Sequence, residues 1–236
     1  MLLLRRRLLQ KTVQRRFVPT RLLGHCFSTS NGLSKTVAEI QECIKQDLKQ
    51  HTSNDSFKDY LKEFLELNSW VMSTSQDNTR IELSKAIGPR EIKVVYQAQL
   101  PQPFDEVHTP EDRVESDEKD RDGSQYTEFL VILSNGAKSK LVFDMIIINN
   151  ELSVNGAFIS EDPLIDIESR FKSNPENRYI GPDFETLSDD LQASIVAYLN
   201  EMGINADLAD FIVESSIYFD AQLQQDMLVQ FQEFLA

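Results

Sequence analysis

The middle of the chain contains five short runs with the patterns of strands, which either alternate in hydrophobicity or are rich in β-branched and aromatic residues. They cover residues 80–87, 92–98, 129–133, 141–148 and 151–159. The dipeptides Asn135-Gly136 and Asn149-Asn150 lie between runs and favour tight turns. Parallel strands would instead need crossovers of about a dozen or more residues. The sequence therefore predicts an antiparallel sheet of consecutive strands.

Apolar residues recur at spacings of three and four residues on both sides of these runs. The segments with this spacing are 37–48, 57–65, 187–202, 208–212 and 223–235. Each predicts an amphipathic helix, or part of one, whose polar side faces water. The last segment ends in apolar residues, which we expect to pack against the sheet or against another subunit. The predicted fold class is α+β.

The first 30 residues differ in charge from the rest of the chain. They contain seven Lys and Arg residues and no acid, and Leu9, Val13 and Phe17 recur on one helical face. This composition is typical of a mitochondrial presequence. A secretory signal is disfavoured because Arg5–Arg7 interrupt the apolar residues, and a basic arm that binds nucleic acid is disfavoured because the body of the chain is acidic. We expect residues 1–30 to be removed, which leaves residues 31–236 as one domain in the mitochondrial matrix.

That domain carries 17 basic and 38 acidic residues, a net charge of −21. Residues 105–128 alone hold ten acids and three basic residues, and residues 179–236 hold eleven acids and no Lys or Arg. We expect residues 101–125 to form a flexible acidic loop at the edge of the sheet. A surface of one sign attracts basic partners and repels nucleic acid phosphates, so direct nucleic-acid binding is disfavoured. The segment that comes closest to a spanning helix is 141–148, which is interrupted by Asp144 and is far shorter than the roughly 18 residues required, so we expect no transmembrane segment.

Residues that commonly act in catalysis are few. His25 lies in the predicted presequence, His51 at a helix break and His108 in the acidic loop. Cys43 falls on the apolar side of the first predicted helix, and we interpret it as a small core residue. The sequence has no glycine-rich phosphate loop and too few Cys and His for a zinc site. We therefore predict no catalytic residue, no cofactor and no enzymatic activity, and an enzyme with an unrecognised site is the disfavoured alternative.

Residues 118–123 match the first half of an EF-hand loop, with acids at alternate positions and Gly123 at the sixth. The twelfth position is Phe129, where an EF-hand needs a bidentate Glu. The sequence therefore predicts no dedicated metal site, and weak association of calcium with these carboxylates stays open.

Several groups of residues together resemble one known family. They are Leu141-Val142-Phe143-Asp144-Met145, the stretch from Tyr179 to Phe184 with Gly181-Pro182, and Leu187, Leu191-Gln192, Tyr198-Leu199, Gly203-Ile204, Leu208-Ala209 and Phe211. With the basic N-terminus and the acidic loop, they resemble the mitochondrial acidic matrix protein family, also called the mitochondrial glycoprotein family. The resemblance covers nearly all of residues 31–236.

The resemblance implies a highly twisted antiparallel sheet of about seven consecutive strands, the first at residues 70–75. One N-terminal and two C-terminal helices would flank the sheet, and three copies would close into a doughnut-shaped homotrimer. The apolar residues near the C-terminus would then lie in the subunit interface. They are Leu223, Met227, Phe231, Phe234 and Leu235.

The resemblance also implies a non-enzymatic binding protein of the matrix that supports mitochondrial translation, ribosome assembly and oxidative phosphorylation. Its partners would be basic proteins, such as mitochondrial ribosomal proteins or translation factors, held by an acidic surface. The acids that we predict for this surface are Asp112, Glu115, Asp117, Glu118, Asp120, Asp122, Glu185, Asp189, Asp190, Asp207, Asp210 and Glu214. The alternative is a calcium or cation buffer of the matrix that uses the same carboxylates.

Overall fold

The computed structural model describes residues 30–50, 55–103, 125–162 and 181–236. Residues 1–43 and residues 44–236 form two compact units. The predicted presequence, apart from Ser30, and residues 104–124 of the predicted acidic loop lie outside the described residues, so both remain predictions.

Two helices precede the sheet, as the periodicity predicts. Helix α2 spans Ser30–Gln50 and helix α3 spans Asp55–Asn68. The interpretation of Cys43 as a core residue is wrong, because its side chain is exposed. The neighbouring Ile44, which is turned by about 100° around the helix axis, is only 4% exposed and takes the buried position instead.

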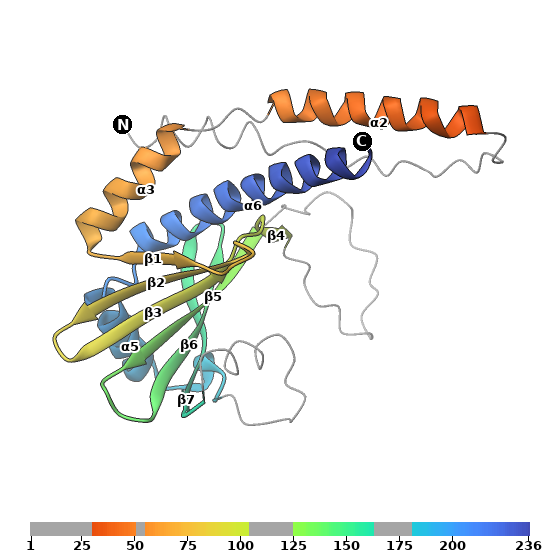
Figure 1. The fold of residues 1–236 in the computed structure, drawn as a ribbon. Helices are drawn as coiled ribbons and strands as arrows, with labels where there is room; N and C mark the ends of the chain where they lie inside the picture. Colours follow the sequence, from red (N-terminus) through yellow and green to blue (C-terminus); the bar gives the residue numbers. More distant parts are fainter. Residues whose placement is uncertain (1–29, 51–54, 104–124, 163–180) are drawn as a thin grey trace, which may run out of the picture. The chain divides into compact units, whose positions relative to one another are not determined.

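The sheet is antiparallel throughout and follows the chain in order (Figure 1). Six strands are neighbours in the order β1-β2-β3-β5-β6-β7, and the two-residue β4 pairs with β5. The strands are β1 Val71–Thr74, β2 Arg80–Ile87, β3 Arg90–Gln97, β4 Gln102–Pro103, β5 Gln125–Ser134, β6 Lys140–Ile148 and β7 Glu151–Ser160. The predicted antiparallel sheet of consecutive strands is thus confirmed.

One expectation about the sheet needs correction. Residues 102–103, which we expected to lie in the acidic loop, form β4, and Gln125, the last residue of the expected loop, begins β5. Gln102 pairs with Tyr126 and Pro103 pairs with Gln125 at the first residues of β5. Proline is tolerated there because β4 lies at an edge, where its missing N–H removes no bond from a central ladder.

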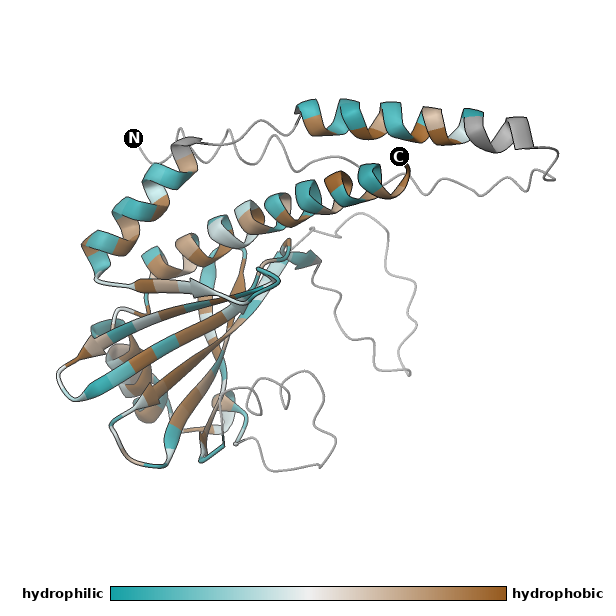
Figure 2. Ribbon diagram, viewed as in Figure 1, coloured by the Kyte–Doolittle hydropathy of each residue, from teal (hydrophilic) through white to brown (hydrophobic). Residues whose placement is uncertain are grey.

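The inner face of the sheet carries the main core. Side chains alternate along each strand, and those on this face are almost fully buried. They include Ile81, Leu83, Ile92, Val94, Tyr96, Phe129, Val131, Phe143, Met145 and Ile147. The outer face has a smaller buried cluster of Val95, Leu130, Ile132, Val142 and Phe158. Strands β3, β5 and β6 bury apolar side chains on both faces, and β5 and β6 are largely hydrophobic in Figure 2.

Two helices follow the sheet, α5 at Asp189–Glu201 and α6 at Ala206–Phe234. Gly203 has a φ of +87° and ends the first helix. Asn205 caps α6, because its side chain accepts a hydrogen bond of 3.1 Å from the Leu208 amide. The sequence predicted separate segments at 208–212 and 223–235, and the structure shows one continuous helix of 29 residues. It is continuous because no Gly or Pro interrupts residues 206–234.

The first half of α6 packs against both the sheet and α3. Phe64 of α3 stacks on Phe211, with ring centroids 4.1 Å apart, and Phe57 stacks on Tyr218 at 4.6 Å. The buried Tyr96 hydroxyl lies 2.8 Å from Ser215 Oγ, and its burial raises its pKa. Aromatic stacking and this hydrogen bond together hold α6 to the rest of the core.

The chain returns to the sheet edge before α5. Gly181 has a φ of +93°, and a Cβ atom at this position would lie 2.1 Å from the Ala157 carbonyl oxygen. Asp183 forms an isolated bridge with Gly156 of β7 and caps the short 3₁₀ helix η1, Phe184–Thr186. This close approach, which requires glycine, fixes where α5 begins. None of the helices that the structure describes has the length and hydropathy needed to cross a bilayer.

Candidate binding surface of the C-terminal helices

Six of the acids predicted for a binding surface lie among the described residues, and four of these fall at or just before the start of a helix. Asp189 and Asp190 occupy the first turn of α5, and Glu185 lies just before it in η1. Asp207 lies in the first turn of α6. Acids at these places also interact favourably with the helix dipole, by about 0.3–1 kcal/mol each. Their positions are therefore explained in part by helix stability, and their exposure decides whether they are available to a partner.

The structure separates the six described acids into two groups. Glu185, Asp189, Asp190 and Asp207 are exposed, whereas Asp210 and Glu214 on α6 are half-buried. Asp210 Oδ1 accepts a hydrogen bond of 3.0 Å from Asn150 Nδ2, in the turn between β6 and β7. The other six predicted acids, Asp112, Glu115, Asp117, Glu118, Asp120 and Asp122, lie outside the described residues. The exposed acids that can meet a partner are thus concentrated at the start of α5.

Basic side chains lie near the opposite end of α5. The Arg90 guanidinium carbon is 5.6 Å from the centre of the Tyr198 ring, and Lys85 Nζ is 5.3 Å from the Trp70 ring centre. A Cβ atom on Gly203, just after α5, would lie 3.3 Å from Lys85 Nζ. Cations are favourable near the carboxyl end of a helix. The surface around α5 is therefore most acidic at its N-terminal end.

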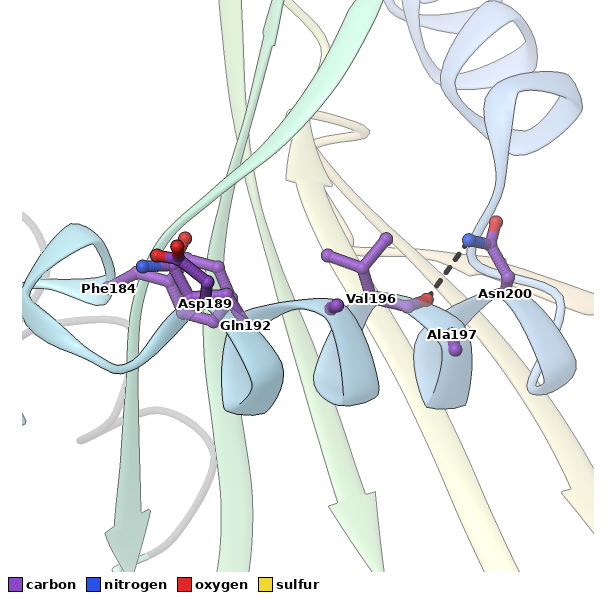
Figure 3. A pocket seen from close by; sticks show the side chains of 7 residues that line it. Phe184, Asp189, Gln192, Val196, Ala197 and Asn200 are labelled. Atoms are coloured by element: carbon purple, nitrogen blue, oxygen red, sulfur yellow. Dashed lines mark hydrogen bonds between the residues drawn. The ribbon is translucent and has the colours of Figure 1, made fainter.

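A groove of about 570 Å³ runs along the side of α5 that does not pack on the sheet (Figure 3). Its lining residues are Phe184, Asp189, Gln192, Ala193, Val196, Ala197 and Asn200. Gln192 Nε2 donates a hydrogen bond of 2.8 Å to the Leu187 carbonyl, and Asn200 Nδ2 donates one of 3.0 Å to the Val196 carbonyl. The Gln192 amide is thus held by the end of η1 and the Asn200 amide by α5 itself, so the middle of the groove is apolar.

The sequence did not indicate this groove. The periodicity placed the apolar residues of α5 on a single buried side that included Leu191. Leu191 is in fact 46% exposed, because the side chains that reach the core are centred on Leu199 and Met202. The signal that could have revealed the groove is the spacing of Ala193, Val196 and Ala197, which repeats at three and four residues.

The residues predicted for a subunit interface lie on the second half of α6. The buried residues of this helix end at Ser216. Beyond it, Met227 is 51% exposed, Phe231 42% and Phe234 83%. Leu223 and Leu235 are half-buried, and Leu223 packs at the margin of the main core. Large apolar side chains gathered on an exposed surface mark an interaction site.

A metal centre needs several ligating side chains that converge on one point. Among the described residues, no group of three or more His, Cys, Asp or Glu side chains is arranged to hold a metal ion. Residues 118–123, the partial EF-hand match, are not among the described residues.

Comparisons with known proteins agree with this fold. A sequence model described as mitochondrial glycoprotein matches residues 39–235. A Leishmania major hypothetical protein, described as of unknown function and as a sequence homologue of human p32 protein, is 16% identical with a TM-score of 0.60. That match covers 85% of this chain and 99% of the other. The Trypanosoma brucei p22 protein is 20% identical with a TM-score of 0.60, over 86% of this chain and 100% of the other. The two structures therefore share the fold described above.

Proposed function

This chain belongs to the mitochondrial glycoprotein family, and on that basis we propose that it is a non-enzymatic protein that holds basic proteins on an acidic surface. Family membership supports a mitochondrial location. The matrix as its compartment, cleavage of residues 1–30, and roles in mitochondrial translation, ribosome assembly and oxidative phosphorylation are parts of the proposal.

One observation carries the proposal. Residues 179–236 contain eleven acids and no Lys or Arg, and the acids at the start of α5 are exposed. Ordinary protein surfaces mix both signs of charge. A surface of one sign concentrates partners of the opposite sign and speeds their association. Basic ribosomal proteins and translation factors have the complementary charge.

We further propose that the protein assembles as a homotrimer through the second half of α6. This helix of 29 residues is about 43 Å long at about 1.5 Å per residue, and its last turns expose Met227, Phe231 and Phe234. Burying these side chains between subunits would remove apolar surface from water. Three copies of the acidic surface would also bind a basic partner by avidity.

The oligomer is tested by light scattering of the full chain. The proposal expects a mass of three subunits, and it expects Phe231→Asp with Phe234→Asp to lower the mass. Gln230→Asp with Gln232→Asp is the matched control, because it adds the same charge to neighbouring positions of the same helix. A monomeric wild-type chain, or equal masses for both double variants, would contradict the proposed interface.

The binding function is tested by titrating the full chain with a lysine-rich peptide at rising salt. We expect affinity to fall steeply as NaCl rises from about 50 to about 300 mM, because salt screens exposed charges. The triple variant Glu185→Gln, Asp189→Asn, Asp190→Asn should lose most of this affinity. Its control neutralises three exposed acids of α3 that lie beside Lys58 and Lys62, namely Asp59→Asn, Glu63→Gln and Glu66→Gln. Equal losses in the two triple variants would refute a role for the start of α5.

No described feature favours the alternative of a calcium or cation buffer. Multivalent cation sites need several oxygen ligands converging on one point, and no such cluster is found among the described residues.

A further inference from the structure

We propose that the groove along α5 binds a basic partner as an amphipathic helix, with the apolar side of that helix seated on Ala193, Val196 and Ala197. This inference rests on the proposed function and adds the form in which the partner is recognised. An acidic surface alone would accept an extended chain and a helix equally, because both can present Lys and Arg side chains. The groove adds a shape that distinguishes between them.

Helix α5 has apolar side chains on two sides, although packing on the sheet uses only one. On the inner side Leu199 and Met202 are buried, and Ile195 and Tyr198 pack against the same core. On the outer side Ala193, Val196 and Ala197 are all exposed, and Val196 is 42% exposed. A helix that packs on a sheet needs a single apolar stripe. Packing on the sheet therefore does not use the second stripe, which stays exposed.

The outer stripe has the spacing that a docked helix requires. Its members are three and four residues apart, which places them on one side of α5. Helices pack by fitting ridges of side chains into grooves between side chains. Two of the three floor residues are alanines, which leave room for larger side chains of a partner. Amphipathic helices are commonly recognised in apolar grooves through residues at this spacing.

The groove is also formed before any partner arrives. Gln192 and Asn200 would block it or require desolvation if their amides projected outward. Instead, their side-chain nitrogens donate to the Leu187 and Val196 carbonyls, as Figure 3 shows for Asn200. Prior ordering of a site lowers the entropy that binding must overcome.

The charges around the groove select a basic helix and set its direction. Asp189 lies in the groove itself, and Glu185 and Asp190 lie near the same end. The other end of α5 is mixed in sign, because Glu201 is exposed in its last turn and Arg90 lies against Tyr198 on the inner side. The basic residues of the partner should therefore gather at the end that lies over the first turn of α5.

The test measures the affinity of the full chain for two synthetic peptides by fluorescence anisotropy. One is an amphipathic helix of about 18 residues, somewhat longer than the 13 residues of α5, with leucines on one side and lysines on the other. The second peptide has the same composition in a scrambled order without an apolar side. We expect the amphipathic peptide to bind at least about tenfold more tightly, a ratio that corresponds to about 1.4 kcal/mol.

Two variants of α5 locate the binding site. Ala197→Arg fills the groove, whereas Ser194→Arg adds the same charge to an exposed position of α5 outside it. The proposal expects Ala197→Arg to abolish the preference for the amphipathic peptide and Ser194→Arg to retain it. Circular dichroism and thermal midpoints equal to those of the wild type establish that both variants are folded.

The outcomes distinguish this inference from the proposed function. Equal binding of both peptides at low salt, with equal effects of the two variants, would overturn the helix groove and leave the acidic surface supported. Failure of both peptides to bind would overturn both proposals. A fall in oligomer mass in Ala197→Arg alone would show that a second copy of this chain occupies the groove, which overturns the basic helix as its occupant.

Discussion

Replacing Asp144 by asparagine should stabilise the protein at neutral pH. Asp144 lies on the outer face of β6, where burial raises the pKa of its carboxyl to about 6 from an ordinary value of 3.8. Repulsion from Glu128 raises it further, and a hydrogen bond from Asn155 opposes the shift. Asn155 is the extra residue of a bulge, because Asp144 pairs with Gly156 while the next residue, Met145, pairs with Val154.

The magnitude follows from the difference between the folded and unfolded pKa values. A rise of about two pKa units costs the ionised folded state about 3 kcal/mol, at about 1.4 kcal/mol per unit. The carboxyl is only partly shielded from water, so we reduce this to about 1–2 kcal/mol. The amide introduced by Asp144→Asn would keep the shape of the side chain and could still accept a hydrogen bond from Asn155, and it removes the charge.

The size of the effect depends on pH. The folded state binds the Asp144 proton more tightly than the unfolded state does, so stability falls as pH rises from about 4 to about 6. The gain from Asp144→Asn should therefore be close to zero at pH 4 and complete at pH 7. The free energy of unfolding is measured in urea across this range, at one protein concentration because assembly adds to apparent stability.

The exposed Asp226→Asn on α6 is the matched control, and its free energy of unfolding should change by less than about 0.5 kcal/mol at every pH. A gain in Asp144→Asn that is the same at pH 4 and pH 7, or a loss at pH 7, would refute the reasoning. Either result would mean that the ionised carboxylate is well solvated or well paired in the folded protein.

Three further changes should lower stability. Phe211→Ala removes a fully buried ring that stacks on α3 and should cost about 3–5 kcal/mol in urea unfolding, whereas a cost below about 1 kcal/mol would mean that α3 does not pack there. Asn205→Ala removes the cap of α6 and should cost about 1 kcal/mol in the same assay, whereas no change would show that the cap is dispensable. Gly181→Ala should lower the thermal midpoint more than Gly136→Ala, because both glycines have positive φ but only the first faces a carbonyl at clashing distance; equal effects would show that backbone strain alone matters.

The sequence was informative about the sheet wherever strands bury apolar side chains. Strands β5 and β6 have near-continuous hydrophobic runs because both of their faces are buried. The hydrophobic pattern did not predict strand β1, because three of its four residues are exposed. Only the family resemblance indicated this strand. The sequence did not predict strand β4 either, because proline, here Pro103, is unfavourable in strands, although an edge position tolerates it.

The candidate site was harder to predict, because exposure depends on tertiary packing. The counts of acids in residues 179–236 indicated the sign of the surface, but could not show that Asp210 is half-buried and bonded to Asn150. The groove on α5 was missed because alanine is a favourable helix residue at almost any position. The sequence shows Asp144 as a charged residue between apolar neighbours. Only the structure shows that its carboxyl is largely buried and that a bulge brings Asn155 within hydrogen-bonding distance of it.

The order of the strands also bears on how the chain assembles in time. Each of β1, β2, β3, β5, β6 and β7 pairs with its neighbour in chain order, so a chain that emerges from its N-terminus can build the sheet one hairpin after another. The inner face, however, is covered only in part until Leu208, Phe211 and Ile212 of α6 join Leu199 and Met202 of α5. Until then a nearly complete sheet displays part of its main apolar surface to water, which favours aggregation. The packing of α6, the last helix that the structure describes, therefore determines when the inner face of the sheet is fully buried and the chain is protected from aggregation.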